Sequence, residues 1–135
     1  VEEELKQTEG DPQVRSRIRQ RQRQLAMSRM LKEVERADVV VTNPVHVAVA
    51  LRYDAERMAA PVICAKGAGE VAERIKAVAK EHRVPIVRQE ELARGLFFGA
   101  DVGEGVPPEF YQAVAELLAF VYRLRGDGTL GRRRQ

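Results

Sequence analysis

Short β-branched runs and alternating residues predict four strands in the middle of the chain. Val39-Val40-Val41 is a β-branched run that suits a buried strand. A second strand is predicted at His46–Tyr53, where successive side chains would point to opposite faces. One of these faces consists of His46, Ala48, Ala50 and Arg52, and its alanines leave room for a helix to lie close. Two further strands are predicted at Val62–Lys66 and Pro85–Arg88.

Apolar residues three and four positions apart predict helices between and after these strands. One helix is expected from about Glu70 to His82, and a short one from Glu90 to Phe98. A last helix would open at Pro107-Pro108 and end near Arg125. Strands interleaved with helices indicate an α/β domain, with a small mixed four-stranded sheet flanked by helices.

An extended N-terminal linker helix is predicted before the sheet. Val14–Arg36 contains no glycine or proline, and Pro12 suits the first position of a helix. Its first half has too few large apolar residues to bury a continuous face, whereas the spacing in its second half favours docking onto a domain. We therefore predict a charged linker segment at 1–36, a globular domain at 37–126 and a basic flexible tail at 127–135.

The charge is unevenly distributed, although the net charge is only +3. Residues 15–32 contain seven basic side chains and no acidic one, and Arg132-Arg133-Arg134 forms a second basic cluster. Such runs bind nucleic acid or anionic lipid, so a basic nucleic-acid-binding module is one alternative function. However, the aromatic residues lie mostly at core spacings and offer no platform on which bases could stack. We therefore expect no nucleic-acid partner.

Length and composition fit a single domain with a sizeable core. The chain has 135 residues, of which 44% are hydrophobic. Its single cysteine, Cys64, excludes an internal disulfide and lies in an apolar run, so we expect it to be buried. No stretch approaches the ~20 apolar residues that span a bilayer. The sequence begins at Val1 rather than methionine, which is compatible with a piece of a longer protein.

Common patterns of catalytic and ligand-binding sites are missing from the sequence. Gly67-Ala68-Gly69 lacks the third glycine of a dinucleotide fingerprint and the Gly-Lys-Ser/Thr of a P-loop, which favours an ordinary turn between a strand and a helix. The two histidines, His46 and His82, lie far apart and have no cysteine or carboxylate at ligand spacing. There is no Gly-x-Ser-x-Gly elbow of a hydrolase. We therefore expect no metal, no cofactor and no turnover of an external substrate.

Asn43-Pro44-Val45-His46 is the motif with specific chemistry. Its simplest interpretation is a turn between two strands, since Asn and Pro both favour turns. Proline has no N–H, so the usual attack of the next backbone nitrogen on the asparagine side chain is impossible at Asn43. The remaining route is attack by the Asn43 side-chain nitrogen on its own carbonyl carbon. This attack would close a succinimide ring, expel the Pro44 nitrogen and cut the chain.

His46 is the nearest group that could assist this reaction. An unperturbed imidazole titrates near ~6.5, so a neutral ring is available at physiological pH. Such a ring could polarise the amide or carry a proton to the departing nitrogen, and acid–base catalysis of this kind contributes on the order of 10²–10⁴-fold. The alternative is that the histidine is a strand residue whose ring is only hydrogen-bonded.

Longer stretches of the sequence carry a resemblance to a known family. They are Gly10-Asp11-Pro12, Arg17–Gln20, Ala37–Pro44, Ala48–Asp54, Met58–Pro61, Ala65-Lys66-Gly67, Val84-Pro85-Ile86, Leu92-Ala93-Arg94 and Tyr111–Glu116. Together these stretches resemble the export-gate switch proteins of flagellar and virulence type III secretion systems. The resemblance covers nearly the whole chain, and it is closer to the flagellar branch than to the injectisome branch.

The resemblance implies self-cleavage at Asn43-Pro44. Members of this family carry four transmembrane helices before this domain, which lies at the cytoplasmic face of the bacterial inner membrane. Their Asn-Pro-Thr-His motif cuts itself at the Asn-Pro bond, and the two pieces remain associated. Asn43, Pro44 and His46 match the motif, whereas Val45 stands where threonine is usual. A hydroxyl is therefore lost at Val45, but the similar shape of valine should preserve the turn.

The resemblance also implies a function and a set of partners. Cleavage permits a switch in export specificity from early substrates (rod and hook, or needle) to late ones (filament, or translocators). The implied partners are other export-gate membrane components, export substrates and a hook-length-control type protein. The cut would be a single-turnover maturation of the protein itself.

Overall fold

The computed structural model describes residues 10–126. The chain divides into two compact units between Met30 and Leu31. Within the described residues, no helix has the length and apolar character needed to cross a membrane. The basic tail that the sequence predicts at 127–135 lies outside the described residues.

The first unit contains most of the helix α2, which runs from Pro12 to Val34. The carboxylate of Asp11 accepts a hydrogen bond from the Gln13 backbone N–H at 2.9 Å and so caps the start of the helix. Pro12 occupies the first helical position, as predicted from the sequence. Most α2 side chains in this unit are exposed, including those of its arginines.

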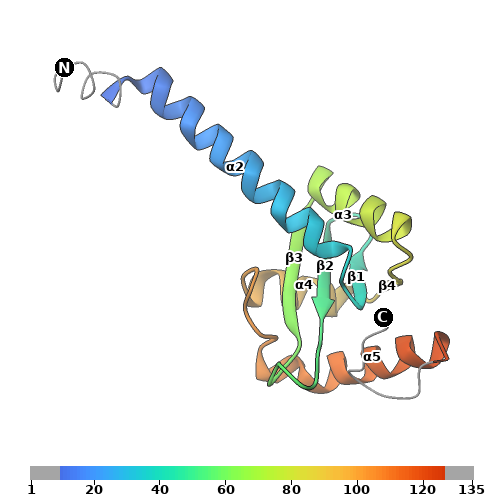
Figure 1. Cartoon of the computed structure of the whole chain (residues 1–135). Helices are drawn as coiled ribbons and strands as arrows, with labels where there is room; N and C mark the ends of the chain where they lie inside the picture. The colour runs from blue at the N-terminus through green and yellow to red at the C-terminus, as the bar shows by residue number, and fades with distance from the viewer. Residues whose placement is uncertain (1–9, 127–135) are drawn as a thin grey trace. The chain divides into compact units, whose positions relative to one another are not determined.

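A four-stranded mixed sheet forms the centre of the second unit. Its strands are β1 (Val39–Asn43), β2 (Val47–Arg52), β3 (Val62–Ala68) and β4 (Ile86–Arg88). They lie in the order β3-β2-β1-β4 (Figure 1). β2 is antiparallel to both β1 and β3, whereas β4 is parallel to β1. The fold predicted from the sequence, a small mixed sheet flanked by helices, is therefore confirmed.

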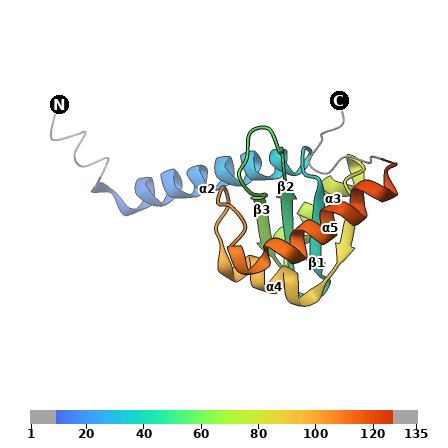
Figure 2. The ribbon, with the colours of Figure 1, turned by 90° about the horizontal axis from the view of Figure 1, so that it is seen from below.

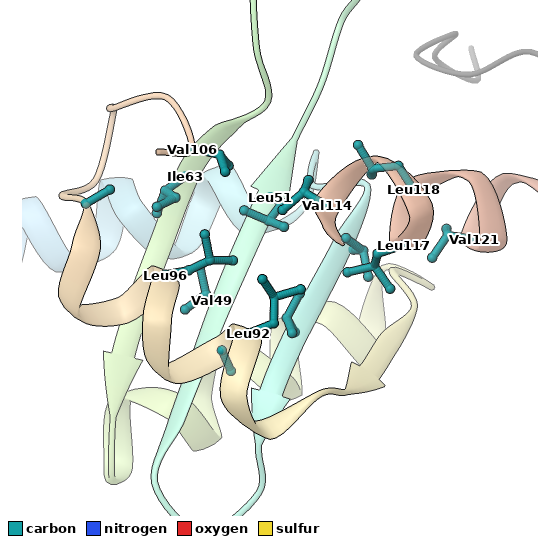
Figure 3. Close-up of a cluster of buried hydrophobic side chains, with 14 of the residues drawn as sticks. Val49, Leu51, Ile63, Leu92, Leu96, Val106, Val114, Leu117, Leu118 and Val121 are labelled. Atoms are coloured by element: carbon teal, nitrogen blue, oxygen red, sulfur yellow. The ribbon is translucent and has the colours of Figure 1, made fainter. Parts of the chain in front are cut away.

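Two helices cover one face of the sheet and build the main core. They are α4 (Glu90–Gly99) and α5 (Tyr111–Leu124), and the short 3-10 helix η1 (Pro108–Phe110) leads into α5. Figure 2 shows α5 crossing this face of the sheet, with α4 alongside. In the core, strand side chains that include Val49, Leu51 and Ile63 pack against helix side chains (Figure 3). The helix side chains include Leu92 and Leu96 of α4 and Val114 and Leu117 of α5.

The opposite face of the sheet packs against α3 (Glu70–Glu81). Ala48 and Ala50 alternate with the core residues of β2 and are completely buried on this side. Gly67 pairs with Ala48 in the ladder, and a Cβ built on Gly67 would lie 2.2 Å from Val71 Cγ1 of α3. The small residues therefore allow α3 to lie close to the sheet, as the alternation in the sequence predicts.

Cys64 is buried, as predicted from its apolar surroundings. Burial raises the pKa of its thiol to about 12, mainly through desolvation, and the charge of Glu33 adds to this shift. The thiol therefore stays protonated and behaves as a small apolar side chain.

Candidate functional site: the exposed turn between β1 and β2

The Asn-Pro motif forms the turn that joins the two central strands. Asn43 is the last residue of β1, and Val47, the first residue of β2, is its partner in the ladder. Pro44, Val45 and His46 make up the connection and are all exposed, Val45 by 79%. Asn43 itself is only 9% exposed. The Asn43–Pro44 peptide bond thus lies at the boundary between the packed core and solvent.

Backbone hydrogen bonds hold this turn at both ends. The His46 N–H donates to the Asn43 carbonyl oxygen at 2.9 Å and closes a β-turn with proline at its second position. The His46 carbonyl oxygen accepts a hydrogen bond from the Gly69 N–H at 3.2 Å. Before the turn, the Thr42 carbonyl oxygen accepts from the Gln89 N–H at 3.1 Å. The residues on either side of the bond are therefore held by a hydrogen bond within the turn and by two other segments of the chain.

The turn predicted at Asn43-Pro44-Val45-His46 is present, but the second strand begins one residue later than predicted. The second strand was expected to begin at His46, whereas β2 begins at Val47 and His46 belongs to the turn. The reason is the register, because pairing of Asn43 with Val47 leaves three residues for the connection. The His46 ring is consequently exposed instead of lying on the alanine face of β2, and it makes no hydrogen bond or ion pair with another residue in the part of the chain that the structure describes.

Two residues that anchor the site, Gly69 and Gln89, are not evident from the sequence. The Gly67-Ala68-Gly69 pattern predicts only an ordinary turn before a helix, and no motif distinguishes Gln89. Gly69 has φ 57° and ψ −125°, a conformation that glycine adopts far more readily than other residues. This conformation aims its N–H at the His46 carbonyl oxygen. A glycine directly before a helix is a weak signal for such a contact, since the contact depends on tertiary structure.

The hydrogen bond to Asn43 gives the site a chemical bias. An N–H donor at 2.9 Å withdraws electron density from the Asn43 carbonyl and makes its carbon a better electrophile. The same N–H would stabilise the negative charge that forms on this oxygen during attack at the carbon. The nearest amide nitrogen that could attack is that of the Asn43 side chain, which belongs to the same residue.

The described residues form no metal-binding cluster at this site. Across residues 10–126, no three His, Cys, Asp or Glu side chains come together in a way that could hold a metal ion. His82, the second histidine, ends α3 and lies 3.7 Å from the Glu35 carboxylate, measured from Nε2 to Oε2. The two histidines are thus not brought together.

Comparison with solved structures places the fold in a defined class. The crystal structure of the cytoplasmic domain of FlhB from Shewanella putrefaciens matches with a TM-score of 0.72 and 40% identity, over 81% of this chain and 84% of that one. A mutated EscU C-terminal domain matches with a TM-score of 0.66 and 24% identity, over 68% of this chain and 92% of that one, and shows likeness of fold alone. The fold therefore belongs to the class of FlhB-type cytoplasmic domains.

Comparison of sequences identifies the family to which the chain belongs. The chain is 48% identical to the flagellar biosynthetic protein FlhB of Bacillus subtilis over 125 residues, which are 93% of this chain and 35% of that protein. It is 49% identical to the FlhB of Salmonella typhimurium over 93% of this chain and 33% of that protein. The sequence profile of the FlhB HrpN YscU SpaS Family matches residues 1–121. The chain belongs to this family, and it spans about a third of the length of these relatives.

Proposed function

We propose that this chain is the cytoplasmic switch domain of a flagellar-type protein-export component, and that it cuts its own backbone between Asn43 and Pro44. The observation that carries the proposal is the Asn43 carbonyl, which is polarised by the His46 N–H and lies in an exposed turn between two buried strands. Family membership supports the same conclusion. The domain would lie at the cytoplasmic face of the bacterial inner membrane, joined to membrane helices.

The proposed reaction is an intramolecular transfer of the Asn43 acyl group. The Asn43 Nδ2 attacks the Asn43 carbonyl carbon, and a new C–N bond closes a five-membered ring. The bond from this carbon to the Pro44 nitrogen breaks, while one proton moves from Nδ2 to the departing nitrogen. The products are a piece that ends in a succinimide at residue 43 and a piece that begins with the amine of Pro44, and water later opens the succinimide.

The anchored turn supplies the geometric part of the catalysis. Because nucleophile and electrophile belong to one residue, attack depends only on the backbone and side-chain torsions of Asn43. Pro44 biases these torsions away from the helical region, and the ladder with Val47 and the Gly69 contact limit their movement. The His46 N–H is already in place for the developing oxyanion. The attack therefore needs no nucleophile from outside Asn43.

His46 is the proposed proton carrier, and its exposure next to the bond suits that role. If the neutral ring takes the proton, protonation of the ring removes the acceptor, so the cleavage rate should fall toward acidic pH. His46→Ala should slow cleavage by about 10²–10⁴-fold and flatten this pH dependence. The measurement is a time course on denaturing gels of uncut protein freshly refolded from denaturant, between about pH 5 and 9.

Val45→Ala is the matched control for this experiment. Val45 is the neighbouring turn residue and is 79% exposed, so its truncation removes little packing. It should leave the pH dependence of cleavage unchanged. Equal rates for His46→Ala and the parent at every pH would reduce His46 to a turn residue.

Cleavage would serve a change in what the export apparatus accepts. An intact turn fixes Asn43 to Pro44, whereas a cut turn frees both new ends at an exposed surface without removing any core strand. Partners that bind this surface would then distinguish the uncut protein from the cut protein. The partners proposed are other export-gate membrane components, export substrates and a hook-length-control type protein.

This switch predicts a defined defect in cells. The chain, fused to the membrane half of a relative, should restore export of both early and late flagellar proteins to a strain that lacks that relative. The uncut Asn43→Ala variant should restore early export and lose late export, because the surface stays in its first state. Immunoblots of culture supernatants for hook and filament proteins measure this. Normal filament export by a variant shown to be uncut would contradict the switch and leave the cleavage chemistry standing.

A further inference from the structure

β4 forms an edge of the sheet with unpaired backbone groups. In the described residues it pairs with β1 and with no strand on its other side. The Val40 N–H donates to the Pro85 carbonyl oxygen at 2.8 Å, and the Gln89 N–H donates to Thr42 at 3.1 Å. Backbone groups alternate in direction along a strand. The N–H and C=O groups of Ile86 and Arg88 therefore point away from β1.

A groove lies beside this edge, between β4 and α5. We call it the β4 groove, and its volume is about 350 Å³. It is lined by Val87, Gln89, Ala113, Glu116, Leu117 and Phe120. The walls are mainly apolar, and the Phe120 side chain is 44% exposed although it belongs to a helix that packs on the core. The volume is large enough for apolar side chains of a ligand.

The charges around the β4 groove favour a ligand that carries a basic residue next to the apolar residue that enters the groove. Glu116 is the charged residue of the lining. At the end of β4, the Arg88 guanidinium lies 3.6 Å from the Glu90 carboxylate, measured from Nε to Oε1, so this arginine is already opposed by an acidic group. A ligand with a lysine or arginine beside its apolar residue would complement Glu116.

We propose that the β4 edge binds an extended polypeptide segment as a fifth strand. The segment would pair with the outward backbone groups of Ile86 and Arg88, place an apolar side chain in the β4 groove and direct a basic side chain toward Glu116. An open strand edge next to a side-chain pocket is the combination that strand addition requires. A helix laid in the groove would leave these backbone groups unpaired. That the segment belongs to an exported protein rests on the proposed function, whereas strand addition does not.

Binding of a synthetic peptide to the purified protein, whether cut or uncut, tests the proposal. The probe is a fluorescein-labelled peptide of about ten residues that alternates threonine with valine or leucine and carries a lysine beside its central leucine. A second peptide of the same sequence is N-methylated at alternate residues, which removes the donors on one edge. Binding of the unmodified peptide should raise its fluorescence anisotropy to a plateau, and it should protect the Ile86 and Arg88 amides from hydrogen exchange. The second should bind at least tenfold more weakly.

Two alanine-to-arginine variants locate the binding site. Ala113→Arg places a long charged side chain in the β4 groove and should weaken peptide binding at least tenfold. Ala77→Arg introduces the same change at an exposed position of α3, on the other side of the sheet, and should leave binding unchanged. Self-cleavage of both variants would show that they fold, and it reports on the proposed function independently of peptide binding.

Three outcomes would overturn the proposal. The first is no binding of the unmodified peptide at millimolar concentrations. The second is a failed comparison: either the N-methylated peptide binds the parent as tightly as the unmodified peptide does, or Ala113→Arg binds the unmodified peptide as tightly as the parent does. The third is a concentration-dependent dimer in sedimentation experiments that Ala113→Arg abolishes, because a second copy of the chain would then be the occupant of this edge.

Discussion

Asn43→Ala should remain a single uncut chain under conditions in which the parent separates completely into two pieces. The substitution removes the only nucleophile that the proposed ring closure can use, so the expected loss is total rather than partial. The fold should survive, because Asn43 ends β1 and its backbone pairing with Val47 does not depend on the side chain. The measurement is a denaturing gel of purified protein after prolonged incubation near pH 8.

Asn43→Asp is the matched variant for this prediction. Aspartate has nearly the shape of asparagine, and its carboxylate is ionised near pH 8, so it offers no amide nitrogen to close a succinimide. It should also stay uncut, which separates the chemistry of the side chain from its shape. Cleavage of either variant at the same bond would mean that a contaminating protease, or a different nucleophile, breaks the chain.

The self-cut protein should unfold at a midpoint that depends on protein concentration. After cleavage, β1 belongs to the N-terminal piece, yet it lies between β2 and β4 of the other piece and all five of its residues are buried. The pieces should therefore stay together and elute as one peak in gel filtration. Unfolding then releases two chains, so each tenfold dilution lowers the apparent free energy of unfolding by ~1.4 kcal/mol.

The uncut Asn43→Ala variant is the control, because its unfolding involves one chain and its midpoint should not move on dilution.

A second comparison tests whether β1 holds the two pieces together. Val41→Ala removes two buried methyl groups and should lower the free energy of unfolding by roughly 1–2 kcal/mol, at ~0.8 kcal/mol per group. Val45→Ala, at the exposed turn position, should change it little. Urea titrations at several protein concentrations measure both effects, and separate elution of the pieces in native buffer would contradict this arrangement.

The order of strands and helices was predictable because local patterns agree with the fold. The β-branched run at Val39–Val41 and the alternation that follows indicate paired strands, and both lie in the centre of the sheet. The alanines of β2 correctly indicate a close helix, since a helix can approach the sheet only where side chains are small. The candidate turn was predictable for a similar reason, because Asn and Pro favour turns without help from distant residues.

The anchors of the turn were not predictable, because they depend on contacts between distant segments. The Gly69 N–H reaches the His46 carbonyl oxygen only because β3 pairs with β2 in a particular register. The predicted start of the second strand at His46 was wrong for a related reason, since the register between β1 and β2 decides where a strand begins. The open edge of β4 depends on strand order, and short-range patterns carry no information about strand order.

The mass of the freshly cut protein under denaturing conditions tests self-cleavage by Asn43 most directly. The uncut chain has a mass of 15.2 kDa. If Asn43 closes a succinimide, the two pieces end at residue 43 and begin at Pro44, and their masses add up to that of the uncut chain, because no water has been consumed. Cleavage by Asn43 would be contradicted by two pieces whose summed mass exceeds the mass of the uncut chain by one water from the earliest time point. It would also be contradicted by a chain that stays whole.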